Sequence, residues 1–286
     1  MILVADSGST KTNWCLLSPK QNPCYFDTEG YNPYFVSSDY IYKSLMATFP
    51  QDINQATVST VYFYGAGCFE DKTGIVSNAL GRFFINAVIH VELDLLGSSR
   101  AVLGNQPGFA AILGTGTNSC VYDGCKIIAN IDSLGYLLGD EGSGFYIGRK
   151  ILSDYIRDYM PPPVKEEFFR VYGLSREAIM ERVYSEELPN RFCAGFTKFI
   201  SDSTADTSYT NNLVRDAFID FFENLVTKYE GYEQYTFNCT GSIGYTFKEI
   251  LSAVATKYNM RVGTVIKTPI EGLAGYHRSL NCRHKE

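Results

Sequence analysis

The chain opens with short apolar stretches separated by polar turns, a pattern that predicts several strands before the first helix. Strands are expected over 1–6, 11–18 and 22–28. Helical spacing then alternates with short apolar runs, which favours parallel pairing because crossover helices join parallel strands. The remaining elements expected in the first half are a helix over 38–48, a strand over 57–64, a helix over 70–86, a strand over 88–94 and a short helix from Ser98.

The opening pattern occurs again in the middle of the chain. Residues 109–113 are apolar, residues 114–119 form a polar loop with two glycines, and an apolar strand resumes at Cys120. Placing Gly8 on Gly116 brings the two loops into register with an offset of 108 residues (116 − 8). We therefore expect the same strand–loop–strand unit twice, although two coincidental polar hairpins would give the same pattern.

The rest of the chain combines a long helical region with a few further strands. The expected elements are a hairpin at Asp123-Gly124 into a strand ending at Ile131, helices over most of 142–230, a strand over 235–240, a helix from Gly241 to about Tyr258, a strand over Arg261–Ile266 and a terminal helix from about Pro269.

Length and composition narrow the class of protein. The 286 residues favour two domains, and the apolar fraction of 45% is sufficient for a sizeable core. The net charge of −6 disfavours nucleic-acid binding. No apolar run approaches the length of a membrane helix and no leader pattern opens the chain, so we expect no membrane partner and a cytoplasmic location. Eight cysteines without a C-x-x-C pair indicate reduced thiols rather than a metal cluster.

The first loop has the composition of a phosphate-binding turn. Asp6 ends an apolar run and is followed by Ser7-Gly8-Ser9-Thr10-Lys11-Thr12. Backbone N–H groups and hydroxyls can bind phosphate oxygens, and a carboxylate can hold hydrated Mg²⁺. No Walker A motif is present, and a strand rather than a helix is expected after Thr12. The alternative is an ordinary polar hairpin turn.

Together these segments resemble the superfamily of actin, hexokinase and the heat-shock chaperone ATPases. Within it the chain is most similar to the BadF/BadG/BcrA/BcrD group, and inside that group to N-acetylglucosamine kinases. The iron–sulfur cysteines of some members of the group and the His/Cys zinc signature of ROK kinases are both missing. The segments that carry the resemblance are Asp6–Thr12, Gly30-Tyr31-Asn32-Pro33, Tyr64–Cys68, Leu93–Gly97, Gly114–Ser119, Gly135 with Leu138–Gly144, and Thr240–Gly244.

The resemblance implies an α/β fold of two ribonuclease-H-like domains with a nucleotide cleft between them. The expected boundaries are 1–105 for the first domain, 106–268 for the second with a helical insertion, and 269–286 for a helix packing back on the first. ATP and Mg²⁺ are the implied cofactors, a small sugar is the implied partner, and a homodimer is ordinary for this size.

The resemblance also assigns nucleotide contacts. Asp6 would hold Mg²⁺, and an adenosine loop would follow the strand over 235–240. The implied nucleotide-binding residues are Asp6, Gly8, Ser9, Thr10, Lys11, Thr12, Gly116, Thr117, Gly241, Ser242 and Gly244. Lys11 could equally be a solvated strand charge, and Gly244 could simply open a helix.

For the sugar, the resemblance makes Asp94 the general base that takes the proton of an acceptor hydroxyl, at C6. Asp94 could also cap the helix expected near Gly97-Ser98. Glu141, and Asp140 with it, could simply favour the N-terminus of the helix that follows. The implied sugar-binding residues are Asn32, Asp94, Thr115, Thr117, Asn118, Asp140 and Gly144.

The resulting prediction is an ATP-dependent kinase of an amino sugar, N-acetylglucosamine being the first candidate and its 6-phosphate the product. Glucosamine, N-acetylmannosamine and muramyl sugars remain alternative acceptors. The alternative from another class is a nucleotide-gated sensor of a sugar or a protein partner that has the same fold and performs no transfer.

Overall fold

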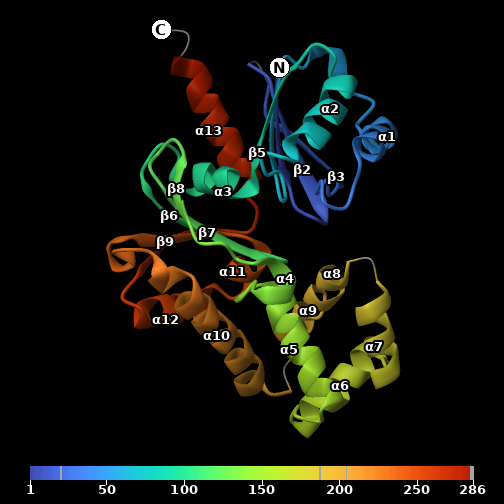
Figure 1. The fold of residues 1–286 in the computed structure, drawn as a ribbon, viewed down its shortest axis with the longest axis vertical. Coiled ribbons are helices and arrows are strands. Elements are labelled where there is room, and N and C mark those ends of the chain that lie inside the picture. Colours follow the sequence, from blue (N-terminus) through green and yellow to red (C-terminus); the bar gives the residue numbers. More distant parts are fainter. Residues whose placement is uncertain (20, 187, 204, 284–286) are drawn as a thin grey trace. The chain divides into compact units, whose positions relative to one another are not determined.

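The computed structural model describes residues 1–19, 21–186, 188–203 and 205–283. The chain divides into two compact units, each built on one five-stranded mixed sheet (Figure 1). Unit 1 comprises Met1–Pro107, Asp123–Lys126 and Thr268–Glu286, and unit 2 comprises Gly108–Tyr122 and Ile127–Lys267. The expected α/β class is confirmed. Residues 284–286 of the predicted terminal segment lie outside the described residues.

The sheet of unit 1 has the strand order β3-β2-β1-β4-β5. β1 pairs antiparallel with β2 and parallel with β4, while β2–β3 is antiparallel and β4–β5 is parallel. Hairpin turns join the antiparallel strands, and helices join the parallel ones, as the apolar spacing predicts. The strands are β1 Ile2–Ser7, β2 Lys11–Leu17, β3 Cys24–Glu29, β4 Thr60–Gly65 and β5 Val88–Leu93.

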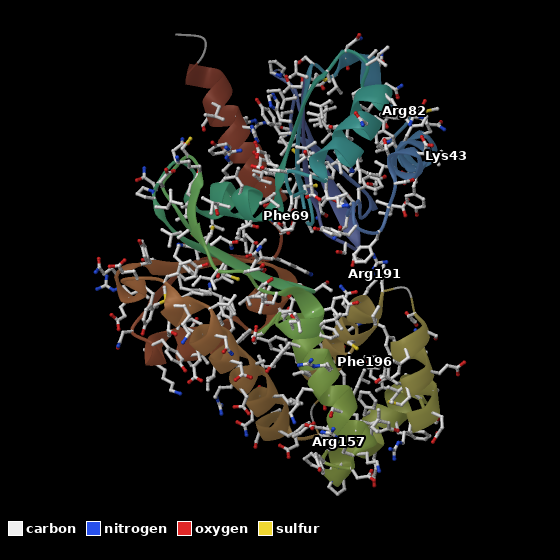
Figure 2. The ribbon with its side chains drawn as sticks, in the orientation of Figure 1. Lys43, Phe69, Arg82, Arg157, Arg191 and Phe196 are labelled. Atoms are coloured by element: carbon white, nitrogen blue, oxygen red, sulfur yellow. The ribbon has the colours of Figure 1, made fainter. Side chains whose placement is uncertain are left out.

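Helices cover both faces of this sheet. Those of unit 1 are α1 Ser38–Thr48, η1 Gln55–Thr57, α2 Thr73–Phe83, α3 Asp94–Leu103 and α13 Ile270–Arg283. On one face, α1 and α2 pack over a core that includes Trp14, Phe63 and Phe83. On the other face, Leu273 of α13 packs on Val4, and α13 also contacts α3. Lys43 and Arg82 lie on the outer side of α1 and α2 (Figure 2).

The sheet of unit 2, in the order β10-β9-β6-β7-β8, repeats the pairing of the first sheet. β6–β7 and β7–β8 are antiparallel, and β6–β9 and β9–β10 are parallel. The predicted repeat of the strand–loop–strand unit is therefore confirmed. The strands are β6 Gly108–Leu113, β7 Thr117–Tyr122, β8 Ile127–Asn130, β9 Thr236–Thr240 and β10 Arg261–Ile266.

The predicted register between the two loops is wrong by two residues. The last strand pair before the turn is Ser7↔Thr12 in unit 1 and Leu113↔Thr117 in unit 2. The N–H of Gly8 donates to the Lys11 carbonyl at 2.9 Å, and the N–H of Gly114 donates to the Gly116 carbonyl at 3.0 Å. Gly8 therefore corresponds to Gly114, not to Gly116. The second turn is one residue shorter, which a comparison of loop letters does not show.

Most helices of unit 2 lie between β8 and β9. They share one apolar core in which Phe168, Phe196 and Phe218 are buried, and Phe196 lies inside the helical region (Figure 2). The helices of unit 2 are α4 Gly135–Leu138, α5 Gly144–Ile156, α6 Pro162–Tyr172, α7 Arg176–Ser185, α8 Pro189–Ala194, α9 Thr197–Asp202, α10 Thr207–Asn224, η2 Val226–Lys228, η3 Tyr232–Gln234, α11 Ser242–Thr246 and α12 Lys248–Lys257.

Three helices differ from the sequence expectation. α2 spans Thr73–Phe83 rather than 70–86, α3 begins at Asp94 rather than Ser98, and Phe247 separates α11 from α12 where one helix was expected. Among the described helices, none is long and apolar enough to cross a membrane. The described cysteines are free thiols, of which Cys24 and Cys125 are exposed.

Candidate functional site

The carboxyl ends of the parallel strands of unit 1 bring the predicted catalytic segments to one edge of the sheet. Ser7 of β1 lies in register with Gly65 of β4, and Gly65 with Leu93 of β5. Asp6 thus lies one residue before this row, and Asp94 directly follows it. This edge is where ligands bind in open α/β sheets.

The hairpin of the first loop is held by buried hydroxyls. Ser7 Oγ and Thr12 Oγ1 are 2.7 Å apart, and Thr12 Oγ1 donates to the Glu29 carbonyl at 2.8 Å. Ser7 Oγ also accepts the N–H of Tyr31 at 3.1 Å. Thr12 is fully buried. We therefore assign its side chain to the hairpin and not, as expected, to the nucleotide.

The tip of the first loop is open to a ligand. Gly8 and Thr10 are exposed and Ser9 is half-buried. A Cβ at Gly8 would find only the Lys11 carbonyl oxygen, at 3.9 Å. The internal packing of the fold therefore does not require glycine here, whereas close approach of a phosphate to the backbone would.

Lys11 is already paired within the sheet. Its Nζ lies 2.8 Å from Asp27 Oδ2, and both side chains are about half exposed, at 52% and 51%. This pair between β2 and β3 supports the interpretation of Lys11 as a solvated strand charge. An exposed pair contributes about 0–1 kcal/mol, so a phosphate could still compete for the ammonium group.

Asn32 is joined to the first loop. Its Nδ2 donates to Ser9 Oγ at 3.1 Å, and its Oδ1 accepts the N–H of Tyr34 at 3.0 Å. The amide is therefore fixed in orientation beside the loop tip. This contact places Asn32, a predicted sugar-binding residue, next to Ser9, a predicted phosphate-binding residue, within unit 1.

The charge of Asp94 acts on Asp6. Burial, and after it the charge of Asp94, raise the pKa of Asp6 to about 7 against a hydrogen bond from Asn13. Burial also raises the pKa of Asp94 to about 6. The charge of Asp94 thus disfavours ionisation of Asp6, and a bound cation would offset this effect.

Asp94 stands at the first turn of α3. Its Oδ1 accepts the N–H of Leu95 at 2.8 Å, and Leu93 rather than Asp94 is the N-cap. The helix that Asp94 was expected to cap begins at Asp94 itself, so its carboxylate accepts an N–H of the first turn without being the N-cap residue. Only part of the carboxylate's hydrogen-bonding capacity is used by the helix.

The acidic residues at this sheet edge fit a magnesium ion better than a metal ion whose ligands are all protein side chains. Among the described residues, no group of three or more His, Cys, Asp or Glu could hold a metal. Magnesium is commonly held by one or two carboxylates with waters and substrate phosphates. Asp6, the predicted magnesium residue, supplies one such carboxylate.

The second loop is tied to the segment 140–145. The carboxylate of Asp140 accepts the N–H of Thr117 at 3.0 Å, and Thr117 Oγ1 donates to the Glu141 carbonyl at 2.8 Å. The N–H of Gly144 donates to the Gly114 carbonyl at 2.8 Å, and that of Phe145 to the Thr115 carbonyl at 3.1 Å. The structure thus uses Thr117 and Gly144 to hold the loop.

Asp140 has an unusual backbone and a buried side chain. Its φ is 56°, and the residue is 7% exposed. Burial raises the pKa of its carboxyl group to about 6, against the hydrogen bonds from Thr117 and Ser133. A Cβ at Gly116 would lie 3.0 Å from its Oδ2. Asp140 therefore packs directly on the second loop, and Gly116 faces it.

The adenosine-loop residues differ in what holds them. Gly241 has φ 114°, and a Cβ there would lie 2.3 Å from the Leu113 carbonyl oxygen. A Cβ at Gly244 would lie 2.6 Å from Cys239 Sγ, so this buried glycine serves packing. Ser242 is exposed at the start of α11. Ser242 is the one of these three residues that has a side chain, and that side chain is accessible.

Asn118 is oriented by its own neighbours. Its Oδ1 accepts the N–H of Ser119 at 2.9 Å and the Nδ2 of Asn130 at 3.0 Å. Thr115 is half-buried at the loop tip. Of the sugar-binding residues that the sequence predicts in unit 2, Thr115 has the least constrained side chain.

Sequence reasoning did not assign a role to Gly30. A Cβ at this position would lie 2.4 Å from the Gly8 carbonyl oxygen and 2.6 Å from the Thr10 nitrogen. Its N–H donates to the Thr10 carbonyl at 3.1 Å. The G-Y-N-P segment was part of the resemblance, and this contact explains physically why a glycine supports the first loop.

Three solved structures resemble the whole chain. A Porphyromonas gingivalis protein provisionally named N-acetylglucosamine kinase has 38% identity and TM-score 0.92, covering 98% of this chain and 100% of its own. A Streptomyces griseus ROK family glucokinase in complex with glucose and AMPPNP has 12% identity and TM-score 0.55, covering 97% and 98%. Spiroplasma citri MreB 5 bound to AMPPNP has 11% identity and TM-score 0.57, covering 99% and 96%.

The two remote structures share the fold alone, which is that of the actin-like ATPases. No protein-family model matches the sequence, and no curated protein matches it either.

Proposed function

Because the chain belongs to the same family as the Porphyromonas gingivalis protein, whose fold is that of actin-like ATPases and sugar kinases, we propose that it phosphorylates an amino sugar. The proposed reaction transfers the terminal phosphate of ATP to the C6 hydroxyl of N-acetylglucosamine. Membership of the BadF/BadG/BcrA/BcrD group is part of the proposal and rests on the loops and the G-D-E-G-S segment.

The observation that carries the proposal is the pair formed by Asp6 and Asp94 at one sheet edge. Asp94 is the proposed general base. It takes the proton of the attacking hydroxyl as the bond to the transferred phosphorus forms and the bond to the leaving ADP oxygen breaks. A raised pKa suits this role, because a base works best when its pKa lies near the working pH.

Asp6 is the proposed magnesium residue, binding directly or through water. When bound, Mg²⁺ neutralises charge on the transferring phosphates. The exposed loop from Gly8 to Lys11 is proposed to bind phosphate oxygens through its backbone N–H groups and the Ser9 and Thr10 hydroxyls. Thr115, Gly116 and Thr117 contribute the second phosphate loop, with Gly241 and Ser242 beside the adenosine.

Asn32 is the proposed sugar contact that the geometry supports best, since its amide is fixed beside Ser9. Thr115, Asn118 and Asp140 remain proposed sugar contacts. Thr117 and Gly144 act indirectly in this proposal, because their hydrogen bonds are made within unit 2.

The test is an ADP-release assay with ATP and Mg²⁺ across hexoses and N-acetylhexosamines, with NMR identification of the phosphorylated position. We expect selective turnover of N-acetylglucosamine and a fall of about 10²- to 10⁴-fold in kcat for Asp94→Asn. Glu92→Gln is the matched control, because Glu92 is exposed on β5, two residues before Asp94. It should retain activity.

AMPPNP affinity of Asp94→Asn should stay close to that of the unaltered protein. Nucleotide binding without any sugar-stimulated ADP release would contradict the kinase and favour the sensor. Turnover of another amino sugar in preference would keep the reaction and replace the substrate.

A further inference from the structure

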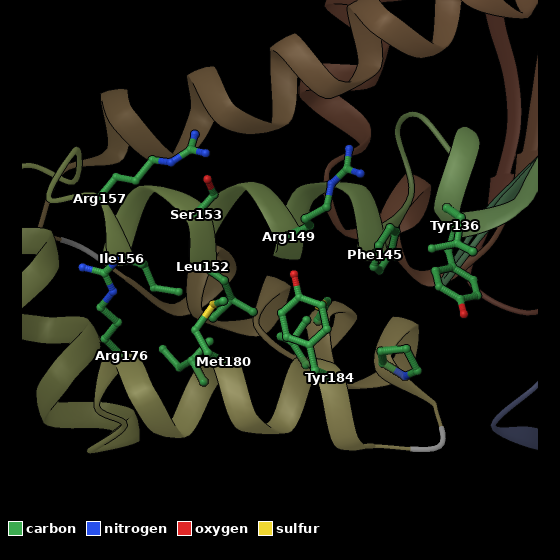
Figure 3. Close-up of a pocket in the computed structure, with 15 residues that line it drawn as sticks. Tyr136, Phe145, Arg149, Leu152, Ser153, Ile156, Arg157, Arg176, Met180 and Tyr184 are labelled. Carbon is green, nitrogen blue, oxygen red and sulfur yellow. The ribbon is translucent and has the colours of Figure 1, made fainter.

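Unit 2 contains a groove between α5 and α7 that no part of the proposed reaction uses. The cavity measures about 600 Å³. α8 packs against both helices, whereas Leu152 of α5 and Met180 of α7 face one another across the gap (Figure 3). The volume lies in the range of small-molecule sites, about 300–1,000 Å³.

The floor of the groove is apolar and closely packed. Leu152, Ile179 and Cys193 are almost fully buried. Above them, Met180 is 41% exposed and Tyr184 is 82% exposed. Apolar side chains at the rim of an apolar floor are left exposed to water, which binding of an apolar body would relieve.

Positive charge borders this apolar surface. The described lining includes Arg149, Arg157 and Arg176 and contains no Asp or Glu. Arg149 lies over the ring of Tyr146, with 5.1 Å to its centroid. Arg157 and Arg176 make no ion pair with any residue in the described part of the chain. The positive charge of this lining contrasts with the net charge of the whole chain, which is −6.

Charge and apolar surface are separated along the groove. Arg176 lies at one end, Met180 and Leu152 in the middle, and Tyr184 toward the other end, while the guanidinium group of Arg157 lies on the side of α5 that carries Ser153 (Figure 3). A ligand with one anionic end and an apolar body matches this order.

We propose that the groove binds a small amphipathic anion, with its carboxylate or phosphate at Arg176 and its apolar body over Leu152 and Met180. Guanidinium groups recognise both kinds of oxyanion by paired hydrogen bonds. A helical peptide fits less well, because three turns of helix about 10 Å wide occupy roughly 1,300 Å³.

The proposed anion end of the groove is remote from the second loop. The loop bonds to the N-terminal end of α5, through Gly144 and Phe145, and Phe145 also lines the far end of the groove, whereas Arg176 lies by the C-terminal end of α5 (Figure 3). The 13 residues of α5 separate these ends by about 20 Å.

The test uses the full chain and the fluorescent aromatic sulfonate 8-anilinonaphthalene-1-sulfonate. We expect saturable binding, with affinity at least tenfold lower in Arg176→Ala. Arg170→Ala is the matched control, since Arg170 is an exposed arginine of α6 outside the groove lining. Its affinity should not change. Met180→Trp, which fills the groove, should also lower the affinity at least tenfold.

Competition identifies the head group. Decanoate and decyl phosphate should displace the probe, whereas decanol and decylamine should displace it at least tenfold less well. The preferred oxyanion is that of the anion, decanoate or decyl phosphate, that displaces the probe at the lower concentration. Absence of saturable binding, equal affinity in Arg176→Ala, or equal displacement by decylamine would overturn the proposal. Displacement by an acidic amphipathic peptide but not by decanoate would assign the groove to a protein partner and overturn it too.

Discussion

The carboxylate of Asp140 accepts the backbone N–H of Thr117 at 3.0 Å, which joins the glycine-rich loop of unit 2 to the G-D-E-G-S segment. Two motifs separated by about twenty residues in the sequence thus form one structural element. Asp140 can shape the loop even where it does not touch a ligand.

Asp140→Ala should destabilise the protein by about 1–3 kcal/mol, because the Thr117 N–H loses its partner in a buried place. Alanine also tolerates the φ of 56° poorly, whereas asparagine accepts it well. Asp140→Asn is therefore the matched variant and should retain most of the stability. Urea unfolding measures both. Equal losses in the two variants would show that the negative charge, rather than the hydrogen bond, holds the loop.

Gly30→Ala and Gly8→Ala should behave differently although both lie at the first loop. A Cβ at Gly30 meets backbone atoms of residues 8–10 at 2.4–2.6 Å, so we expect a loss of about 1–3 kcal/mol. A Cβ at Gly8 has space, so stability should change by less than about 1 kcal/mol. AMPPNP titration of Gly8→Ala should nevertheless show weakened binding. Unchanged affinity there would remove the loop tip from the proposed phosphate site.

His277 should make the stability of the protein depend on pH. The residue is buried, its ring stacks on Tyr62 with centroids 4.0 Å apart, and its Nε2 lies 2.9 Å from the Tyr64 hydroxyl oxygen. Burial, assisted by the charges of Arg100 and His90, lowers its pKa to about 3. Below pH 6.5 the unfolded chain binds a proton that the folded chain does not, so stability falls as the pH falls.

Between pH 7 and pH 5, proton binding by His277 in the unfolded chain is expected to lower the free energy of unfolding by about 2 kcal/mol. One proton taken up on unfolding changes this free energy by about 1.4 kcal/mol per pH unit. His277→Gln should be less stable at pH 7 but should lose about 2 kcal/mol less on acidification. His90→Gln, at an exposed position on β5, is the control and should keep the original slope. Parallel stability curves for the unaltered protein and His277→Gln would contradict this account.

The pH profile of the proposed reaction should report Asp94. Its carboxylate must be deprotonated to accept a proton, and burial raises its pKa to about 6. The value of kcat/KM should therefore be highest above this pH and fall about tenfold per pH unit below it. Steady-state kinetics between pH 5 and pH 8 test this directly. A rate independent of pH over that range would argue against Asp94 as the base.

Much of the site's location was predictable from local pattern. Asp6 is the penultimate residue of β1 and Asp94 directly follows β5, and the carboxyl ends of parallel strands meet at one sheet edge. Whether each predicted site residue leaves its side chain accessible to a ligand was not predictable. Thr12 and Thr117 look like exposed loop hydroxyls in the sequence, yet both are buried and hydrogen-bonded inside their own units.

The sequence by itself determined the α/β class, the repeated strand–loop–strand unit and the acidic residues at strand ends, because alternation and turn residues act locally. Only the tertiary structure decided which loop glycines correspond, where α3 begins, and that Gly30 supports the first loop. It also decided that α5 and α7 leave a groove bordered by arginines. Those features depend on strand register and on contacts between distant segments, which local residue patterns do not encode.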